Sequence, residues 1–528
     1  MYALLRSLNP SQREAVTTTR GPLLVLAGAG TGKTGVITHR MAYLIATEAE
    51  PFEILALTFT NKAAREMKER FFGLAEGLRP SAELKKLTAS TFHSFCVRVL
   101  RKHIEVLEYK RNFSIIAGSD QMALMKEVLS SCGINPTSAE AGKFLALISR
   151  AKNKGISHRQ AGGSAGEGIA RVWIRYEESL KARNALDFDD LLLRVLELLR
   201  DHEVIRADLR NEIRFILVDE YQDTNQLQFE IVQRLASDGS DVCVVGDDDQ
   251  SIYSWRGAES SHILEFDQHF PGAKVVKLEQ NYRCTPNILK AANHVIRNNA
   301  RRHGKELWSA GESGEKLRLV SAISDQDEAE WVAADILRAR ESERIRWEDA
   351  TVLYRANHLS RIFEQTFRQR QIPYRVVGGQ EFYERREVKD VLAFLQVCHV
   401  PEDDVSLLRI INVPPRGVGK AAIETLLKRS KEEQRSVWKE IVEGSMDGMS
   451  SRSVTGLGAF KLLVDEYRQK FTENDAWSGT LKALLEDIGY LAEIKRPQSG
   501  HTARGHSVHR TFNNFFPYGP LLLLTPLQ

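Results

Sequence analysis

The sequence predicts a doubly wound α/β fold with helical insertions, from two features of its 528 residues. Short apolar runs alternate with longer helix-like stretches, and the runs lack a polar face, which is typical of a parallel sheet covered on both sides. The length exceeds what a single core supports, so about three or four domains or subdomains are expected. The predicted strands are Leu23–Ala27, Ile54–Thr58, Phe215–Asp219, Val242–Gly246 and Lys274–Leu278, and the predicted intervening helices are Arg65–Phe72, Gln226–Leu235 and Pro286–Asn298.

The order of these patterns predicts the domain boundaries. A mostly helical stretch interrupts the first α/β pattern, which returns at Leu317–Val320, Thr351–Tyr354 and Tyr374–Val377 and so predicts a second α/β domain. From about Glu387 the chain becomes helical again. The predicted units are a first core of residues 1–89 and 211–283, a helical insertion of 90–210, a second core of 284–384, a second helical insertion of 385–496, and an aberrant or disordered tail of 497–528.

Composition disfavours several classes of protein. The 73 basic and 70 acidic residues leave a net charge of +3, so a nucleic-acid site would have to be local. The five cysteines lie far apart without metal or redox spacing, which predicts reduced thiols in a cytoplasm. No signal peptide and no apolar run of membrane-spanning length are visible, so no membrane partner is expected. His501, His506 and His509 in the tail lack a Cys or acidic neighbour, which disfavours a metal site there.

A phosphate-binding loop follows the first predicted strand and opens a helix. Its small residues let backbone N–H groups face phosphates, and the helix N-terminus adds positive potential. We expect Lys33 to reach the β and γ phosphates of ATP and Thr34 to ligate Mg²⁺. A merely flexible Gly loop is disfavoured by the strand before it and by the Lys-Thr pair. The loop residues are Ala27, Gly28, Ala29, Gly30, Thr31, Gly32, Lys33 and Thr34.

A second apolar strand ends in two carboxylates. Asp219 is expected to hold the hydrated Mg²⁺, and Glu220 is expected to orient and deprotonate the attacking water. Alone, this pair would also suit a solvated turn. Together with the upstream phosphate loop, it predicts an ATP-hydrolysing enzyme.

Four segments in a fixed order point to one family. With them, the chain from about Leu8 to Arg496 resembles the UvrD/Rep-like superfamily 1 DNA helicases, most of all the Rep group. The resemblance implies two RecA-like P-loop cores, the second incomplete, with inserted helical subdomains. It also implies a 3′→5′ helicase or translocase that serves replication restart, repair or recombination. Such a protein would act as a monomer or weak dimer on single-stranded DNA and on single-strand/duplex junctions. Replication or repair proteins would be its possible partners. The segments are Thr58–Ala64, Asp219–Asp223, Gly246–Ala258 and Gln280–Arg283.

The same resemblance implies roles for individual residues. Gln12 would read the adenine edge, since an amide can donate and accept there at once, and Tyr282 would stack on the base. Gln250 would sense the γ-phosphate. Arg283 would reach it from the start of the second core, where a guanidinium offsets charge developing in the transition state. Gly35 stands where family members often carry Arg, which implies a missing nucleotide contact.

A track for single-stranded DNA is expected beside this site. Such a track needs aromatic platforms and phosphate contacts that ignore sequence. Plain core packing is the alternative for Phe59 and Trp255, and the motif context favours DNA contact. Residues 61–111 hold 12 Lys/Arg against six Asp/Glu, which favours a backbone-tracking surface over a merely solvated helix face. The predicted DNA-binding residues are Phe59, Thr60, Asn61, His93, Tyr253, Trp255 and Arg256, with Gln250 coupled to Tyr253 and Trp255.

Two further segments carry predictions of their own. Leu186–Leu191 places three carboxylates within four positions and could bind Mg²⁺, but the family resemblance makes it a structural motif at the return from the helical insertion. Gly378–Tyr383 resembles the start of the second insertion, where the loop and its aromatics are expected to approach DNA.

The resemblance also implies missing parts and rival functions. Full-length relatives carry a His–Lys–Gly–Leu segment and a later Arg motif that are not found here, which predicts a C-terminal truncation. An arginine finger is worth about 10³–10⁵ in turnover. The alternative function is therefore an ATP- and single-stranded-DNA-binding protein with little or no helicase activity. A transporter-type ATPase is disfavoured because no Ser-Gly-Gly-Gln type signature follows, and a nuclease fusion because no carboxylate cluster with a catalytic Lys follows.

Overall fold

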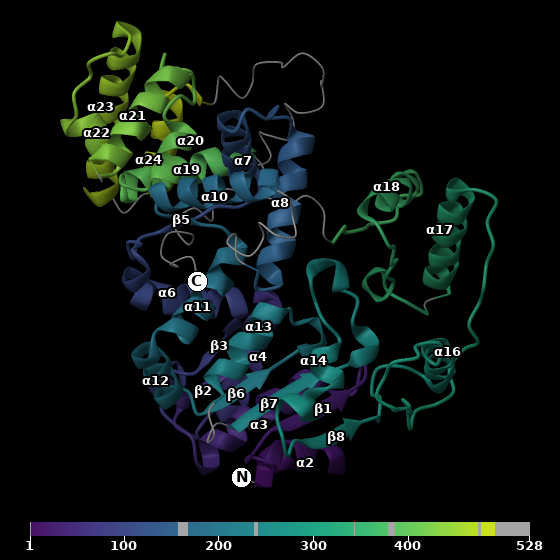
Figure 1. The fold of residues 1–528 in the computed structure, drawn as a ribbon. Helices are drawn as coiled ribbons and strands as arrows, with labels where there is room; N and C mark the ends of the chain where they lie inside the picture. The colour runs from purple at the N-terminus through teal and green to yellow at the C-terminus, as the bar shows by residue number, and fades with distance from the viewer. Residues whose placement is uncertain are drawn as a thin grey trace.

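A six-stranded parallel sheet forms the centre of the first core (Figure 1). The computed structural model describes residues 2–156, 167–236, 241–342, 344–377, 386–433, 435–473 and 477–490. The strand order is β3-β2-β6-β7-β1-β8, and every neighbouring pair is parallel. The strands are β1 (Leu23–Ala27), β2 (Ile54–Thr58), β3 (Thr88–Thr91), β6 (Phe215–Val218), β7 (Asp241–Gly246) and β8 (Lys274–Leu278).

The sequence pattern of the strands explains the sheet. Four of them, β1, β2, β6 and β7, are buried along their whole length. Successive side chains of a strand point to opposite faces, so an all-apolar strand supplies two cores at once. In β2, Leu55 and Leu57 belong to the hydrophobic cluster on one face, and Ile54 and Ala56 belong to the cluster on the other. The predicted sheet is therefore confirmed, and β3 is a strand that the apolar pattern missed because three of the four residues in its Thr-Ala-Ser-Thr sequence are polar.

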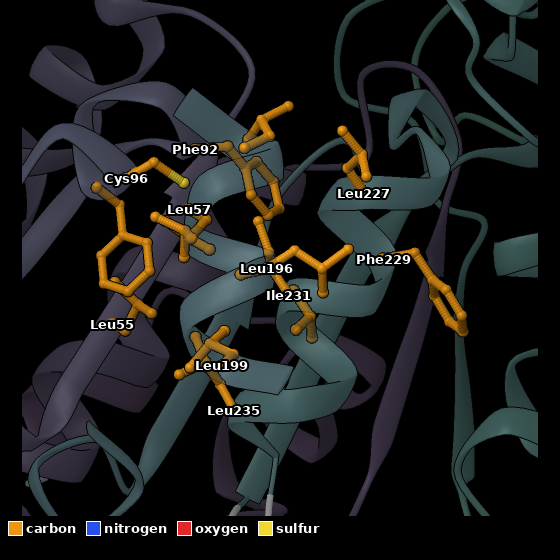
Figure 2. Packing of buried hydrophobic residues seen from close by; sticks show 14 of the residues in the cluster. Leu55, Leu57, Phe92, Cys96, Leu196, Leu199, Leu227, Phe229, Ile231 and Leu235 are labelled. Carbon is orange, nitrogen blue, oxygen red and sulfur yellow. The ribbon is translucent and has the colours of Figure 1, made fainter. Parts of the chain in front are cut away.

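Helices cover both faces of this sheet. Figure 2 shows the packing on one face, where Phe92 and Cys96 of α6 lie near Leu57 of β2, and Leu199 of α11 lies near Leu235 of α13 in the same cluster. The helices of this face are α6 (Phe92–His103), α11 (Phe188–Asp201), α12 (Glu203–Glu212), α13 (Gln226–Leu235), α14 (Ser261–Leu264) and α15 (Phe266–His269). The helices of the other face are α1 (Tyr2–Leu5), α2 (Pro10–Thr17), α3 (Lys33–Thr47), α4 (Asn61–Ala75) and α5 (Ser81–Leu84).

A helical unit rises from the sheet between α6 and α11. It has its own apolar cluster, centred on the fully buried Trp173, Tyr176 and Met125. A two-stranded parallel ribbon of β4 (Ser114–Ile115) and β5 (Ala185–Leu186) joins it to the core. Its helices are α7 (Gly118–Ser131), α8 (Ser138–Asn153) and α10 (Glu167–Ala182). The predicted boundaries of this insertion, 90–210, stay a prediction. α6, α11 and the first part of α12 fall inside that range and pack on the sheet.

The last described part of the chain is a second helical unit. Its core holds Phe394, Trp438, Phe460 and Tyr467. It contacts the first helical unit, because Arg409 is paired with both Asp120 of α7 and Asp390 of its own unit. Figure 1 shows the two helical units side by side. The helices are α19 (Arg386–His399), α20 (Asp404–Ile410), α21 (Lys420–Glu432), α22 (Val437–Glu443), α23 (Ser451–Glu473) and α24 (Trp477–Asp487).

The region between the sheet and this second unit departs from expectation. It holds α16 (Pro286–Ile296), α17 (Asp325–Glu341) and α18 (Ser360–Gln369), but the three segments expected as strands are irregular: 317–320, 351–354 and 374–377. That prediction of strands was wrong. An apolar run becomes a strand only when neighbouring backbone satisfies its N–H and C=O groups. Here Leu319 and Leu353 are 101% and 90% exposed, so these runs are not buried against a partner.

The described residues include neither a membrane-spanning helix nor a disulfide bond. None of the helices in the described ranges is both long and apolar enough to cross a membrane. All five cysteines are free thiols, as their spacing predicted. The segment Gly378–Tyr383 and the tail histidines lie outside the described residues.

Candidate nucleotide site and nucleic-acid interface

The predicted phosphate loop joins the end of β1 to the start of α3. Gly30 and Gly32 have φ values of 72° and 88°, in the left-handed region that favours glycine. The Thr31 hydroxyl donates a 2.8 Å hydrogen bond to the Gly28 carbonyl oxygen and closes the turn. Because α3 begins at Lys33, its unpaired N–H groups and positive end face the loop. The geometry is that of an anion site.

Lys33 meets the two predicted carboxylates at the same edge of the sheet. Its Nζ lies 2.8 Å from Oε2 of Glu220, which follows β6. The carboxyl ends of parallel strands lie at one edge, and this brings residues 187 positions apart into contact. Glu220 has a φ of 50°, which is uncommon for a side chain other than glycine and typical of functional sites. Asp219 is almost buried beside it, and its Oδ1 accepts a 3.0 Å hydrogen bond from the Glu220 N–H.

The environment separates the pKa values of the carboxyl groups. Burial, helped by the charge of Glu220, raises the pKa of Asp219 to about 7, although Lys33 opposes the change. Burial also acts to raise the pKa of Glu220, but the charge and hydrogen bond of Lys33 outweigh it and lower that pKa. Burial and Glu220 raise the pKa of Asp223 to about 6. Lys33 thus outweighs the effect of burial at Glu220, whereas at Asp219 it offsets burial only in part.

The donor atoms near this carboxylate suit a hard divalent cation. Asp219 offers carboxylate oxygens and Thr34, at the start of α3, offers a hydroxyl, which are the ligand types that Mg²⁺ prefers. A cation bound there would favour the ionised form of the buried Asp219, as Lys33 does in part. The residues present therefore fit a Mg²⁺ ion.

Gln222 links the carboxylates to the segment after β7, a role that sequence reasoning missed. Its Nε2 donates to Glu220 at 2.8 Å, and its Oε1 accepts from the Asp247 N–H at 2.9 Å. Any side chain on Gly246 would collide, since an added Cβ would lie 2.7 Å from this Oε1. Asp247 in turn accepts a hydrogen bond from the amide of Gln250. A continuous chain of hydrogen bonds thus runs from Glu220 to Gln250.

The predicted adenine-side residues gather on the other flank of the loop. The Nε2 of Gln12 donates to the Thr31 carbonyl oxygen at 2.9 Å, so its amide lies against the loop backbone. Asn9 caps α2 through the Gln12 N–H and donates a 2.8 Å bond to the Tyr282 hydroxyl. The Tyr282 ring is 57% exposed, which leaves a face free for stacking.

Asn281 holds the segment that carries Arg283 against the loop, and it too was missed. Its Nδ2 donates to the Ala29 carbonyl oxygen at 2.6 Å, and its Oδ1 accepts from the Arg283 N–H at 2.8 Å. The Tyr282 N–H donates to the Gly30 carbonyl oxygen at 2.9 Å. A Cβ on Gly30 would lie 2.6 Å from the Asn281 amide nitrogen, so glycine is required for this approach. Arg283 is consequently exposed next to the loop.

Three of the predicted DNA-binding aromatics lie together. The rings of Phe59, after β2, and Tyr253 are stacked with centroids 5.0 Å apart, and Tyr253 lies 6.2 Å from Trp255. Trp255 is 66% exposed, so it is not a core residue. Thr60 caps α4 by accepting from the Ala63 N–H, and Asn61 beside it is exposed.

His93 and Arg256 are placed differently. His93, on α6, contacts the half-exposed Phe188 of α11 with ring centroids 5.5 Å apart, which adds Phe188 as an aromatic that sequence reasoning missed. Burial lowers the pKa of His93, although Asp189 opposes this, so the imidazole is favoured in its neutral form. The side chain of Arg256 lies outside the described part of the structure.

Two of the three carboxylates of Leu186–Leu191 contact a lysine, and the third, Asp189, accepts a hydrogen bond from the Asn153 amide. The Nζ of the fully buried Lys152 lies 2.9 Å from Asp187 and 2.7 Å from Asp190. Asp187 and Asp190 also form the capping box of α11. The ammonium occupies the position that a metal ion would need, so this cluster ties α8 to α11.

Comparison with known proteins gives a consistent result over most of the chain. Residues 8–271 match the family described as UvrD/REP helicase N-terminal domain, and residues 276–472 match the UvrD-like helicase C-terminal domain. The ATP-dependent DNA helicase PcrA of Staphylococcus epidermidis is 40% identical over 506 residues, which cover 94% of this chain and 68% of that protein. The protein of the same name from Staphylococcus aureus is 42% identical over 503 residues, with the same two coverages of 94% and 68%.

Proposed function

The chain belongs to the UvrD/Rep helicase family, and from this premise we propose that it is an ATP-hydrolysing motor that moves 3′→5′ along single-stranded DNA and unwinds duplex ahead of it. The single observation that carries the proposal is the 2.8 Å contact between Lys33 and Glu220 next to the buried Asp219. A cation on a phosphate loop and a catalytic carboxylate meet there at one sheet edge, as triphosphate hydrolysis requires.

The roles that we propose in ATP hydrolysis follow from the positions of these side chains. Thr34 and Asp219 would hold Mg²⁺, which when bound neutralises charge on the phosphate oxygens. Lys33 exchanges its contact with Glu220 for the β and γ phosphates, and Glu220 is then free to orient a water and take its proton. Arg283, exposed beside the loop, offsets charge on the transferred group. Gln12 and Tyr282 bind the base at the far side of the loop.

The DNA half rests on the aromatic group of Phe59, Tyr253 and Trp255. Stacking on such platforms is tolerant of sequence, which suits a motor that must pass every base. Thr60 and Asn61, at the N-terminus of α4, contact backbone phosphate, where the helix N–H groups already favour an anion. We assign His93 a contact on the same strand of DNA, together with its neighbour Phe188.

Coupling between the two halves follows the hydrogen-bond chain. Glu220, Gln222, Asp247 and Gln250 are connected in that order, and Tyr253 lies three residues beyond Gln250. We infer that a change at the γ-phosphate is passed from Gln250 along this short segment to Tyr253, the ring that stacks on Phe59. The cellular setting that we propose is cytoplasmic DNA replication restart, repair or recombination, at single-strand/duplex junctions.

A stimulated-hydrolysis assay tests this function. ATP turnover should rise on addition of a single-stranded oligonucleotide and should be lost in the Lys33→Ala variant. Duplexes with a 3′ or a 5′ single-stranded tail test polarity, and only the 3′-tailed substrate should be unwound efficiently. Turnover that does not respond to DNA would contradict the motor.

A second candidate function is a protein that binds ATP and single-stranded DNA with little or no unwinding. The observation that favours it is the second core, in which the expected strand segments 317–320 and 351–354 are irregular and expose Leu319 and Leu353. Nucleotide and DNA binding without stimulated turnover would support this alternative, and efficient unwinding would exclude it.

A further inference from the structure

An extended segment outside the family motifs touches several parts of the nucleotide site. This segment, Arg302–Trp308, runs beside the chain that leaves β8. The Trp308 carbonyl oxygen accepts from the Asn281 N–H at 2.7 Å, and the Trp308 N–H donates to Glu279 at 3.0 Å. Leu307 packs on the phosphate loop so closely that a Cβ on Gly28 would lie 2.3 Å from its Cδ2.

The centre of this segment is a buried lysine. The side chain of Lys305 is 2% exposed, and its Nζ lies 2.8 Å from Asp247 and 2.8 Å from Asp249 and also contacts Asp248. Arg302 completes the cluster with two hydrogen bonds to Asp249, of 2.9 and 2.7 Å.

The surroundings keep Lys305 charged. Burial acts to lower its pKa, but the charges and hydrogen bonds of the three aspartates outweigh it and raise that pKa. The three carboxylates lie close enough together to hold a metal ion, within 4.8 Å of one another. The ammonium of Lys305 lies among them, and it offsets the repulsion that three adjacent buried anions would otherwise suffer.

Asp247 divides its two oxygens between Lys305 and Gln250. Its Oδ1 faces the Lys305 ammonium and also accepts a 3.2 Å hydrogen bond from the Asp249 N–H, and its Oδ2 accepts the hydrogen bond from the Gln250 amide. The orientation of this carboxylate is therefore fixed on one side by Lys305 together with the Asp249 N–H, and on the other side it fixes the Gln250 amide. Without the lysine, Asp247 would turn away from its like-charged neighbours, and the amide of Gln250 would lose its fixed acceptor.

We propose that Lys305 is a positioning residue of the nucleotide site, which orients the Gln250 amide toward the γ-phosphate by fixing Asp247. The inference rests on the proposed function, because it deepens the role assigned there to Gln250. The same role would make Arg302–Trp308 the segment that couples the presence or absence of the γ-phosphate to the start of the second core. A purely structural ion cluster is the competing explanation, and the two differ in what they predict for nucleotide discrimination.

The test compares the affinities for ADP and for a non-hydrolysable β,γ-imido analogue of ATP, measured by calorimetry on the full chain with Mg²⁺. The wild-type chain should prefer the ATP analogue. In Lys305→Met this preference should fall about tenfold while the ADP affinity is unchanged, since networks of this kind shift coupling by a few-fold to about thirtyfold. The Gln250→Ala variant should show the same loss, and the double variant should show no further loss. Lys277→Met is the matched control, because the exposed Lys277 contacts the same segment at the Gly304 carbonyl oxygen without reaching the aspartates.

A second variant guards against misfolding. Lys305→Met combined with Asp248→Asn removes one carboxylate together with the cation, so the net charge of the cluster is unchanged and folding is favoured. Asp247 and Gln250 are not substituted in this variant, but Asp247 still lacks the ammonium that holds its Oδ1, so the same preference should be lost. Equal losses for ADP and the ATP analogue, or independent losses from Lys305→Met and Gln250→Ala, would overturn the positioning role in favour of a structural one. A wild-type chain that binds neither nucleotide would instead contradict the proposed function, and this inference with it.

Discussion

Lys33 and Glu220 form an ion pair of 2.8 Å between the phosphate loop and the turn after β6. The pair is partly screened from solvent, with side-chain exposures of 11% and 35%. It has a consequence for binding, because Glu220 competes with the phosphates of a nucleotide for the ammonium of Lys33.

This competition predicts the behaviour of the Glu220→Gln variant. Its affinity for a non-hydrolysable ATP analogue should equal or exceed that of the wild type, because the competing charge is gone. Its turnover should fall by about 10²–10⁴ because the general base is lost. Equilibrium binding and steady-state hydrolysis measure the two effects, with Glu66→Gln, an exposed carboxylate on α4, as control. Weaker binding with normal turnover would refute this assignment.

The raised pKa of Asp219 predicts a pH dependence of nucleotide binding. Its pKa is about 7, against an ordinary value of 3.8, so the folded chain without ligand favours the protonated acid. The stability that this shift contributes is present below about pH 4 and is lost as pH rises through about 7. Binding of Mg²⁺ needs the ionised form, so affinity for the Mg²⁺–nucleotide complex should rise between about pH 6 and pH 8, with release of a proton.

Calorimetry in buffers of different ionisation enthalpy measures that proton. The Asp219→Asn variant should bind the complex weakly at every pH and release no proton from this site. Urea unfolding should likewise show the wild type losing stability relative to Asp219→Asn as the pH rises from about 4 to about 7, with no further relative loss above that pH. A flat affinity profile in the wild type would exclude Asp219 as the ligand.

The exposed Trp255 is predicted to be a stacking platform. Trp255→Ala should weaken binding of a short oligonucleotide by about 1–3 kcal/mol, equally for different base sequences. Fluorescence anisotropy of a labelled oligonucleotide measures this loss. Phe52→Ala is the control, because Phe52 is 46% exposed and precedes β2, whereas Phe59 follows that strand. An unchanged affinity, or a loss confined to one sequence, would count against the track.

The buried Lys152 is predicted to be structural. Lys152→Met leaves Asp187 and Asp190 without their cation, which should lower the free energy of unfolding by about 3–5 kcal/mol. Urea unfolding provides the measurement. In contrast, Lys181→Met removes an exposed pair with Glu108, which solvent screens, and should leave the free energy of unfolding almost unchanged. If these aspartates held a metal ion instead, a chelator would lower the unfolding midpoint of the wild type, and we expect no such change.

Local sequence patterns were enough to predict several strands and helices and the phosphate loop of this protein. The boundaries of β1, β2, β8 and α13 agree with those predicted. β1 and β2 are apolar runs buried on both faces, and α13 buries one apolar face, whereas β8 is an edge strand in which only Val276 and Leu278 are buried. The phosphate loop could be identified because its chemistry lies in eight consecutive residues. The same reasoning failed at 317–320 and 351–354, where hydrophobicity indicates a strand but does not supply the neighbour that a strand needs.

Only the tertiary structure decided which distant side chains work together. The contacts of Gln222 with Asp247, of Asn281 with Ala29 and of Lys305 with three aspartates join residues far apart in the chain. The order of the strands in the sheet brings them to one edge, and no periodicity in the sequence records that order. A motif states which chemical groups are present, whereas the packing of the sheet and its helices sets the distances at which those groups act.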